Sequence, residues 1–165
     1  MPEKAYIALG SNLGDSRRVI SRAMERLQEL SDSPTEKSQI FETTPVDCPP
    51  GSPNFLNAVV ALVPRSGETP ESLLGKLRAL EMEFGRVPKK VLNEPRPLDL
   101  DLIAFGNEIR ATGELTLPHP RAHLRRFVLQ PLAEIAPDLI LPGQRATVAE
   151  LLRQLTSGES VRKLT

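Results

Sequence analysis

The apolar residues of this chain fall into short runs that are typical of β-strands. Residues 4–10 and 55–63 are apolar at nearly every position, which predicts strands that are covered on both faces. Residues 98–105 alternate leucine with aspartate and then continue as an apolar run, and residues 36–42 form a weaker strand pattern. The pattern therefore predicts a sheet with four principal strands.

Two segments between these strands carry apolar residues at helical spacing. The first helix covers about residues 16–30, with Asp15 or Ser16 as its N-cap. The second helix begins after Thr69, and Gly85 stands where a C-terminal glycine is expected. The order β-α-β-β-α-β comprises two split βαβ units and predicts an α+β fold: a ferredoxin-like antiparallel sheet with two helices on one face.

A helical extension is expected to follow this core. Residues 107–122 look irregular, a helix is predicted at about 125–136, and Thr147 opens a capping box for a short helix. We expect residues 1–165 to form one domain with a core at about 4–106, an extension at 107–155 and a tail at 156–165 that frays.

Composition narrows the classes of function. The 165 residues carry 21 basic and 21 acidic side chains, so no net field attracts the protein to nucleic acid or to an anionic membrane. The first residues lack a signal-peptide pattern, and no run is long enough to span a bilayer. Cys48 is the lone cysteine. We therefore expect a cytoplasmic protein with no membrane and no nucleic-acid partner.

The alternation in residues 98–105 is the first chemical signal. A period of two places Asp99 and Asp101 on one face with Ile103 and Phe105, and leucines with Ala104 on the other. A solvated sheet face would stay polar along the strand, whereas this face becomes apolar. Two partly buried carboxylates need a cation or several donors, and oxygen ligands with open positions suit Mg²⁺.

A basic loop precedes this pair. Residues 86–97 carry Arg86, Lys89, Lys90 and Arg96 against one acid, which favours a polyphosphate ligand over a merely solvated charged loop. No Walker loop is present, and GSNLGD at residues 10–15 either binds an anion or only turns the chain.

His119 and His123 offer a weaker signal. They are four residues apart, but Pro120 disfavours one regular helix through both, and no further residue completes a zinc site. With three arginines nearby, His119 is better interpreted as a phosphate contact, and a structural histidine is the alternative.

Several segments together resemble the 6-hydroxymethyl-7,8-dihydropterin pyrophosphokinase family over nearly the whole chain. The segments are YIALGSNLGD, TxPV, FLNAVV, EFGRV, PRPLDLDLIAFGNE, LPHPR and RFVLQPLAEIAPDL, in that order. The resemblance implies a transferase that moves pyrophosphate from ATP to the pterin hydroxymethyl group in folate biosynthesis, with AMP as the leaving group. It also agrees with the predicted ferredoxin-like fold.

The resemblance assigns roles to individual residues. Asp99 and Asp101 would hold two Mg²⁺ ions, and Arg86 and Arg96 would stabilise charge during the transfer. The implied ATP contacts are Glu81, Arg86, Arg96, Leu102, His119 and Arg125. The implied pterin contacts are Thr43, Val46, Phe55, Asn57 and Phe127, with the two aromatic rings enclosing the pterin.

The chain departs from the family pattern at several positions. Pro88 stands where a basic residue is typical and Asn93 where a tryptophan is frequent, so the basic loop has an altered composition. Phe55 replaces a more usual tyrosine, and Pro120 follows the histidine in place of a common tyrosine. None of these changes affects the two aspartates.

Two rival functions belong to other classes. A ferredoxin-like RNA-binding or ligand-sensing module would carry surface aromatic residues and a basic face, but the chain has one tyrosine, no tryptophan and no net charge. A sugar-nucleotide transferase could use the aspartate pair, but 165 residues leave little room for a second nucleotide-binding domain. For the pyrophosphokinase we expect a monomer that binds ATP and the pterin.

Overall fold

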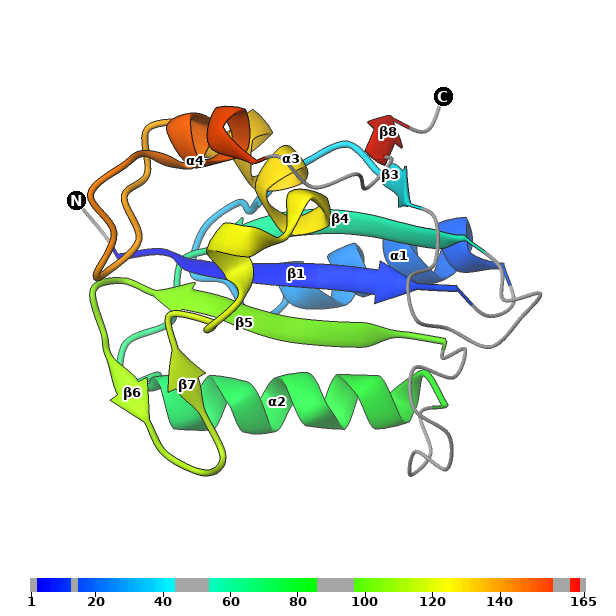
Figure 1. The fold of residues 1–165 in the computed structure, drawn as a ribbon. Helices are drawn as coiled ribbons and strands as arrows, with labels where there is room; N and C mark the ends of the chain where they lie inside the picture. Colours follow the sequence, from blue (N-terminus) through cyan, green and yellow to red (C-terminus); the bar gives the residue numbers. More distant parts are fainter. Residues whose placement is uncertain (1–2, 13–14, 44–53, 86–96, 156–160, 164–165) are drawn as a thin grey trace.

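An antiparallel β-sheet lies between two layers of helices (Figure 1). The structure is a computed structural model that describes residues 3–12, 15–43, 54–85, 97–155 and 161–163. The strands of the main sheet are β1 (Ala5–Ser11), β2 (Glu36–Lys37), β3 (Phe41–Thr43), β4 (Phe55–Leu62), β5 (Asp99–Phe105) and β8 (Val161–Lys163). They lie in the order β5-β1-β4-β3-β8, with β2 beside β4. The predicted α+β class with an antiparallel sheet is confirmed.

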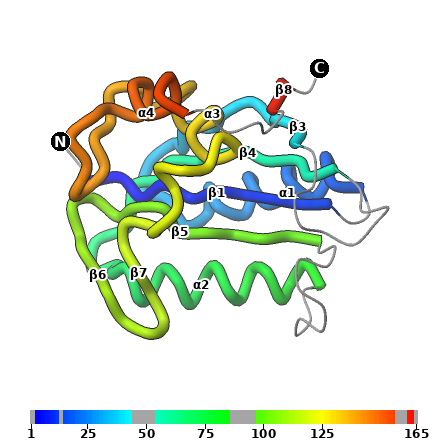
Figure 2. Tube along the Cα trace, in the orientation of Figure 1, coloured from blue at the N-terminus to red at the C-terminus, as the bar shows by residue number. Residues whose placement is uncertain are grey.

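The helices divide between the two faces of the sheet (Figure 2). The helices α1 (Ser16–Gln28) and α2 (Pro70–Glu83) bury their leucines with the alternate residues of β1, β4 and β5 in one core. The helices α3 (Arg126–Ile135) and α4 (Val148–Gln154) bury a second core on the opposite face. None of the described helices combines the length and apolarity needed to cross a bilayer.

Capping residues set the helix boundaries much as expected. The Asp15 side chain accepts a hydrogen bond from the backbone N–H of Arg18 at 3.3 Å. Thr69 and Thr147 both form complete capping boxes. Gly85 follows α2 with a φ of 92°, a left-handed conformation that glycine adopts without strain.

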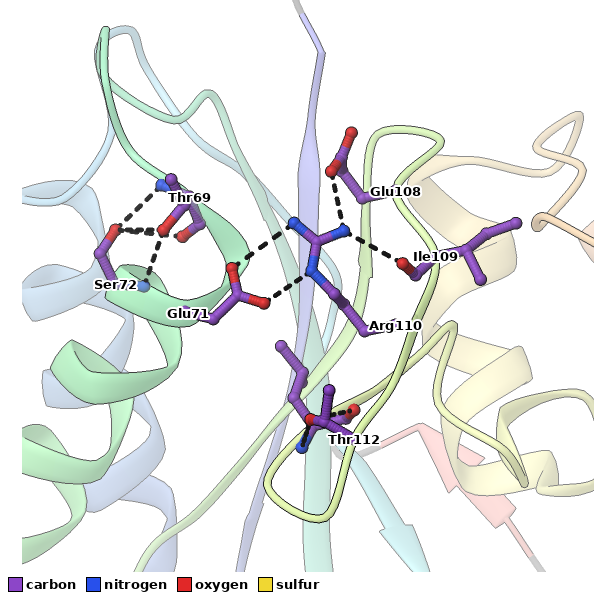
Figure 3. Close-up of polar contacts among 8 residues, drawn as sticks. Thr69, Glu71, Ser72, Glu108, Ile109, Arg110 and Thr112 are labelled. Atoms are coloured by element: carbon purple, nitrogen blue, oxygen red, sulfur yellow. Dashed lines mark hydrogen bonds and ion pairs between the residues drawn. The ribbon is translucent and has the colours of Figure 1, made fainter.

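The segment at 107–122 is less irregular than predicted. It contains a small hairpin of β6 (Arg110–Ala111) and β7 (Thr116–Leu117), followed by a 3₁₀ turn at Ala122–Leu124. Arg110 ties this hairpin to α2, because its Nε donates to Glu71 at 2.6 Å (Figure 3). Long-range ion pairing of this kind leaves no periodic signal in the sequence.

Two further expectations about strands are wrong. The predicted strand at 36–42 is divided into β2 and β3, and the tail does not fray at 161–163, where β8 pairs with β3. Arg162 on β8 donates to Glu42 on β3 at 2.6 Å, which adds a charged contact to the pairing. A strand of three residues is too short to show an alternation in the sequence.

The predicted face of Phe105 is also wrong. The pairing of β5 with β1 skips one residue, because Ile7 lies opposite Leu102 whereas Tyr6 lies opposite Ala104. Ile103 is thus the extra residue of a β-bulge, and the alternation shifts after it. Phe105 consequently packs in the α1 and α2 core with the leucines, and Ala104 packs with Ile103 against α3.

Candidate active site

Asp99 and Asp101 lie on the face of β5 that α3 covers further along the strand. Their neighbours Leu98, Leu100 and Leu102 are buried against α1 and α2, so the two carboxyl groups project to the opposite side. Asp99 pairs with Gly10 and Asp101 with Ala8, and both aspartates are half-buried. These two residues are called the diacid below.

The diacid is an electrostatically unfavourable pair. Burial, and after it the charge of Asp99, raise the pKa of Asp101 to about 6. The guanidinium groups of Arg78 and Arg125 act in the opposite direction. A cation between the two carboxylates would relieve their repulsion, so the donor set fits a hard divalent ion such as Mg²⁺.

The bulge in β5 carries His119 to the same face of the sheet. The carbonyl oxygen of Ile103, which is the extra residue of the bulge, accepts a hydrogen bond from the backbone N–H of His119 at 2.8 Å. The backbone N–H of Arg121 donates to Nδ1 of His119 at 3.2 Å. A neutral His119 therefore carries its proton on Nε2, which is a hydrogen-bond donor for an anion.

Arg125 connects the parts of this site. Burial lowers the pKa of His119, and the charges of Arg125 and Arg121 lower it further, whereas the Asp99 charge raises it. Arg125 also acts on Asp101, and its guanidinium carbon lies 5.4 Å from the centre of the Phe127 ring. The structure thus brings Asp99, Asp101, His119 and Arg125 together, with Phe127 beside them.

The residues predicted to bind the pterin begin on the neighbouring strands. Asn57 on β4 lies opposite Gly10, and its side-chain oxygen accepts a hydrogen bond from the Thr43 hydroxyl at 2.9 Å. Both side chains are buried. Phe55 pairs with Thr43 at the start of β4. The predicted contacts Thr43, Phe55 and Asn57 are therefore neighbours on β3 and β4.

Glu81 and Leu102 lie on the other side of β5 from the diacid. Leu102 is buried in the core against α1 and α2. Glu81 on α2 is 2% exposed, and one of its carboxylate oxygens accepts from the backbone N–H of Leu100 at 2.8 Å. The structure thus shows Glu81 as a contact of the diacid strand, and the assignment of both residues to ATP stays a prediction.

Three predicted site residues, Arg86, Arg96 and Val46, lie outside the described residues. Within the part of the chain that the structure describes, no cluster of three His, Cys, Asp or Glu side chains forms a metal site. A two-carboxylate site is common for Mg²⁺, which keeps water molecules and takes the phosphates of its substrate as further ligands.

Sequence reasoning missed two residues of this region. Gly10 separates Asp99 from Asn57 in the sheet, and a Cβ added there would lie 3.3 Å from Asn57 Nδ2. Arg78 donates through one nitrogen to both Glu81 and the Leu100 carbonyl oxygen. Arg78 and Glu81 are three residues apart on α2, and this spacing predicts an ion pair between them. It does not predict their contacts with Leu100 on β5.

Comparison with known proteins adds independent evidence. The family model described as 7,8-dihydro-6-hydroxymethylpterin-pyrophosphokinase matches residues 6–137. The chain is 36% identical over 159 residues to the 2-amino-4-hydroxy-6-hydroxymethyldihydropteridine pyrophosphokinase of Haemophilus influenzae, covering 96% of each chain. It is 40% identical over 147 residues to the enzyme of that name from Bacillus subtilis, covering 88% of this chain and 84% of the relative.

Solved structures agree at the level of the fold. The wild-type HPPK-DHPS of Plasmodium falciparum with pteroate superposes with a TM-score of 0.72 at 14% identity, covering 93% of this chain and 42% of that one. The chain thus spans less than half of that longer protein. Since the family model covers most of the chain and the bacterial relatives match along nearly all of their length, this chain belongs to the 7,8-dihydro-6-hydroxymethylpterin-pyrophosphokinase family.

Proposed function

We infer that this chain transfers the pyrophosphoryl group of ATP to 6-hydroxymethyl-7,8-dihydropterin, a step of folate biosynthesis, as its family does. The observation that carries the inference is the row Asp99, Gly10 and Asn57 across three neighbouring strands. In this row, one carboxylate of the diacid, which is suited to metal-bound phosphates, lies two strands from an amide that is suited to a heterocycle. A reaction that joins a nucleotide phosphate to a pterin needs both groups on one surface.

The transfer makes one bond and breaks one. The hydroxymethyl oxygen of the pterin attacks the β-phosphorus of ATP, and a new C–O–P linkage forms. The bond between the β-phosphorus and the oxygen that bridges it to the α-phosphorus breaks, AMP leaves, and the hydroxyl proton is released. Positioning and charge stabilisation supply most of the catalysis in phosphoryl transfer, so no dedicated base is required.

We propose that Asp99 and Asp101 hold Mg²⁺, with two ions expected. When bound, Mg²⁺ neutralises charge on the phosphate oxygens and orients the reacting groups. The diacid is suited to this task because both carboxylates project from one face of a single strand. Burial, and after it the Asp99 charge, raise the pKa of Asp101, and that same Asp99 charge attracts a cation.

The remaining polar groups match an anionic nucleotide. His119 presents an Nε2–H donor, and Arg125 supplies a positive charge next to the diacid. We propose that both bind ATP phosphates. Arg86 and Arg96, which the family resemblance assigns to the same substrate, are proposed to stabilise the charge that develops during transfer.

On the pterin side, Asn57 is held in a fixed orientation. The hydroxyl of Thr43 donates to the side-chain oxygen of Asn57, so the Nδ2 group of Asn57 is directed away from this contact and can donate to the pterin edge. We propose that Phe55 and Phe127 pack on the two faces of the heterocycle, and that Val46 adds a loop contact.

Product analysis tests the proposed reaction. Purified protein is mixed with Mg²⁺, ATP and 6-hydroxymethyl-7,8-dihydropterin, and nucleotides and pterins are separated by chromatography. Formation of AMP together with the pterin pyrophosphate is the expected result. Formation of ADP would reject pyrophosphoryl transfer, and an absence of pterin-dependent turnover would reject the assignment. Light scattering of the same sample checks our proposal that the protein acts as a monomer.

A further inference from the structure

Strand β5, which carries the diacid, lies at the edge of the sheet. In an antiparallel sheet, alternate residues of an edge strand direct their backbone N–H and C=O groups away from the neighbouring strand. Leu100 is such a residue, since its backbone groups bond to side chains of α2. Unpaired backbone groups at a covered edge are costly, so Leu100 requires partners other than a strand.

Arg78 and Glu81 of α2 supply those partners and are called the Leu100 bracket below. Glu81 accepts from the Leu100 N–H at 2.8 Å through Oε2. Arg78 donates through Nη1 to the Leu100 carbonyl oxygen at 3.0 Å and to Oε1 of Glu81 at 2.7 Å. The bracket therefore closes a ring of three contacts around a single residue of β5.

The two peptide groups held by the bracket are those that join Leu100 to the two residues of the diacid. The N–H of Leu100 belongs to the peptide that joins it to Asp99, and its C=O belongs to the peptide that joins it to Asp101. Fixing both peptide planes fixes the directions in which the two aspartate side chains leave the backbone. Burying the Glu81 carboxylate, which is only 2% exposed, costs free energy. We take this cost as a sign that the fixed geometry of β5 has a use of its own.

We propose that Arg78 and Glu81 are positioning residues that set the separation and orientation of the Asp99 and Asp101 carboxylates for the metal-bound phosphates. This inference rests on the proposed function of the diacid. Residues that orient the ligands of a metal without touching it change metal affinity or activity by about 10- to 100-fold when they are replaced. The Leu100 bracket binds the backbone of β5, and the charges of Arg78 and Glu81 also act on Asp101.

The structure also offers a matched control on the same helix. Arg110 donates to Glu71 at the opposite end of α2 and so joins that helix to the β6–β7 hairpin (Figure 3). Its replacement removes an Arg–Glu contact of α2 without affecting Leu100. Arg110→Met therefore reports the effect of weakening the attachment of α2 in general, and Arg78→Met reports the effect of opening the bracket.

The experiment measures Mn²⁺ binding by the loss of the free-ion EPR signal, with α,β-methylene ATP present and a protein-free reference subtracted. This analogue cannot undergo the reaction, because a CH₂ group replaces the oxygen that bridges the α- and β-phosphorus, and the bond from the β-phosphorus to that carbon does not break. Arg78→Met is expected to weaken Mn²⁺ binding and to lower kcat by about 10-fold or more each, with the KM for the pterin unchanged. Arg78→Lys, which can still donate to Glu81 and to Leu100, should restore much of both losses.

The outcomes separate this inference from the proposed function. If Asp101→Asn loses Mn²⁺ binding while Arg78→Met binds as the wild type does, the bracket is structural only and the inference is overturned. The inference also fails if Arg110→Met lowers Mn²⁺ affinity as much as Arg78→Met does. If the wild type and Asp101→Asn bind Mn²⁺ equally, the metal site itself is wrong, and the bracket has no metal ligands to position.

Discussion

Asp99 and Asn57 lie opposite the same residue, Gly10, on the two strands that flank β1. Asp99, which is proposed to hold the metal, and Asn57, which is proposed to bind the pterin edge, therefore have only Gly10 between them in the sheet. A Cβ at Gly10 would lie 3.3 Å from Asn57 Nδ2 and 4.0 Å from the Asp99 Cβ. Because Gly10 has no side chain, no Cβ crowds the Asn57 amide at this position.

Gly10→Ala is accordingly expected to disturb the pterin side more than the metal side. The added methyl group is tight only against the Asn57 amide, so Asn57 must shift or lose its orientation. Loss of one oriented hydrogen bond corresponds to an increase in the KM for the pterin of about 10-fold. Steady-state kinetics with each substrate varied in turn would check this, and a larger effect on the KM for ATP would contradict it.

Gly75→Ala is the matched control for that substitution. Gly75 is exposed in the middle of α2, and a Cβ added there meets no atom within 4 Å. Because alanine is favoured over glycine in a helix by up to about 1 kcal/mol, this variant should be slightly more stable than the wild type. Thermal unfolding followed by circular dichroism measures the change, and the kinetic constants should stay as they are.

The diacid itself is tested by Asp99→Asn and Asp101→Asn, which keep the shape of the side chain and remove its charge. Each variant should lose at least about 100-fold in kcat, because the charge proposed to hold the metal is gone. The fold should be retained, since neither carboxylate belongs to the apolar cores. Circular dichroism and product chromatography on the same samples check both statements, and full activity in either variant would refute its assigned role.

The raised pKa of Asp101 makes the stability of the metal-free protein depend on pH. The folded chain binds this proton up to about pH 6, whereas an unfolded aspartate releases it at about pH 4. The folded state thus binds more protons in this window, and the free energy of unfolding falls as the pH rises through it, by on the order of 3 kcal/mol.

Thermal unfolding measured between pH 4 and pH 7 in the presence of EDTA would show this slope. Asp101→Asn lacks the titrating group, so its slope should be smaller than that of the wild type. Equal slopes in the two proteins would mean that other groups control the pH dependence. Mg²⁺ added in excess over the EDTA should offset this loss at pH 7, because it binds the ionised form.

The role of His119 can be tested by replacing it with Asn or with Gln, because each amide side chain places a polar group near one of the two ring nitrogens. Asn places its polar group near the position of Nδ1, where the Arg121 N–H is bonded, and Gln places its amide nitrogen near Nε2. If Nε2–H binds a phosphate, His119→Gln should keep most of the affinity for ATP, and His119→Asn should lose about 10-fold or more. Equal losses in the two variants would argue that His119 acts only as a structural residue.

Much of the fold followed from local patterns. The apolar runs and the capping residues Asp15, Thr69 and Thr147 marked the main strands and helices, because these signals lie within a few neighbouring residues. The tail strand β8 and the β6–β7 hairpin were missed, since each has only two or three residues per strand and depends on distant partners such as Glu42 and Glu71.

The sequence by itself determined the class of fold, the diacid and the family resemblance, because these are recorded in the order and spacing of residue types. Only the tertiary structure decided which side chains meet. The bulge at Ile103 shifts the alternation of β5 and binds the backbone of His119, and the row through Gly10 joins Asp99 to Asn57. Strand register and backbone hydrogen bonds arise between segments far apart in the chain, so no local pattern of residues encodes them.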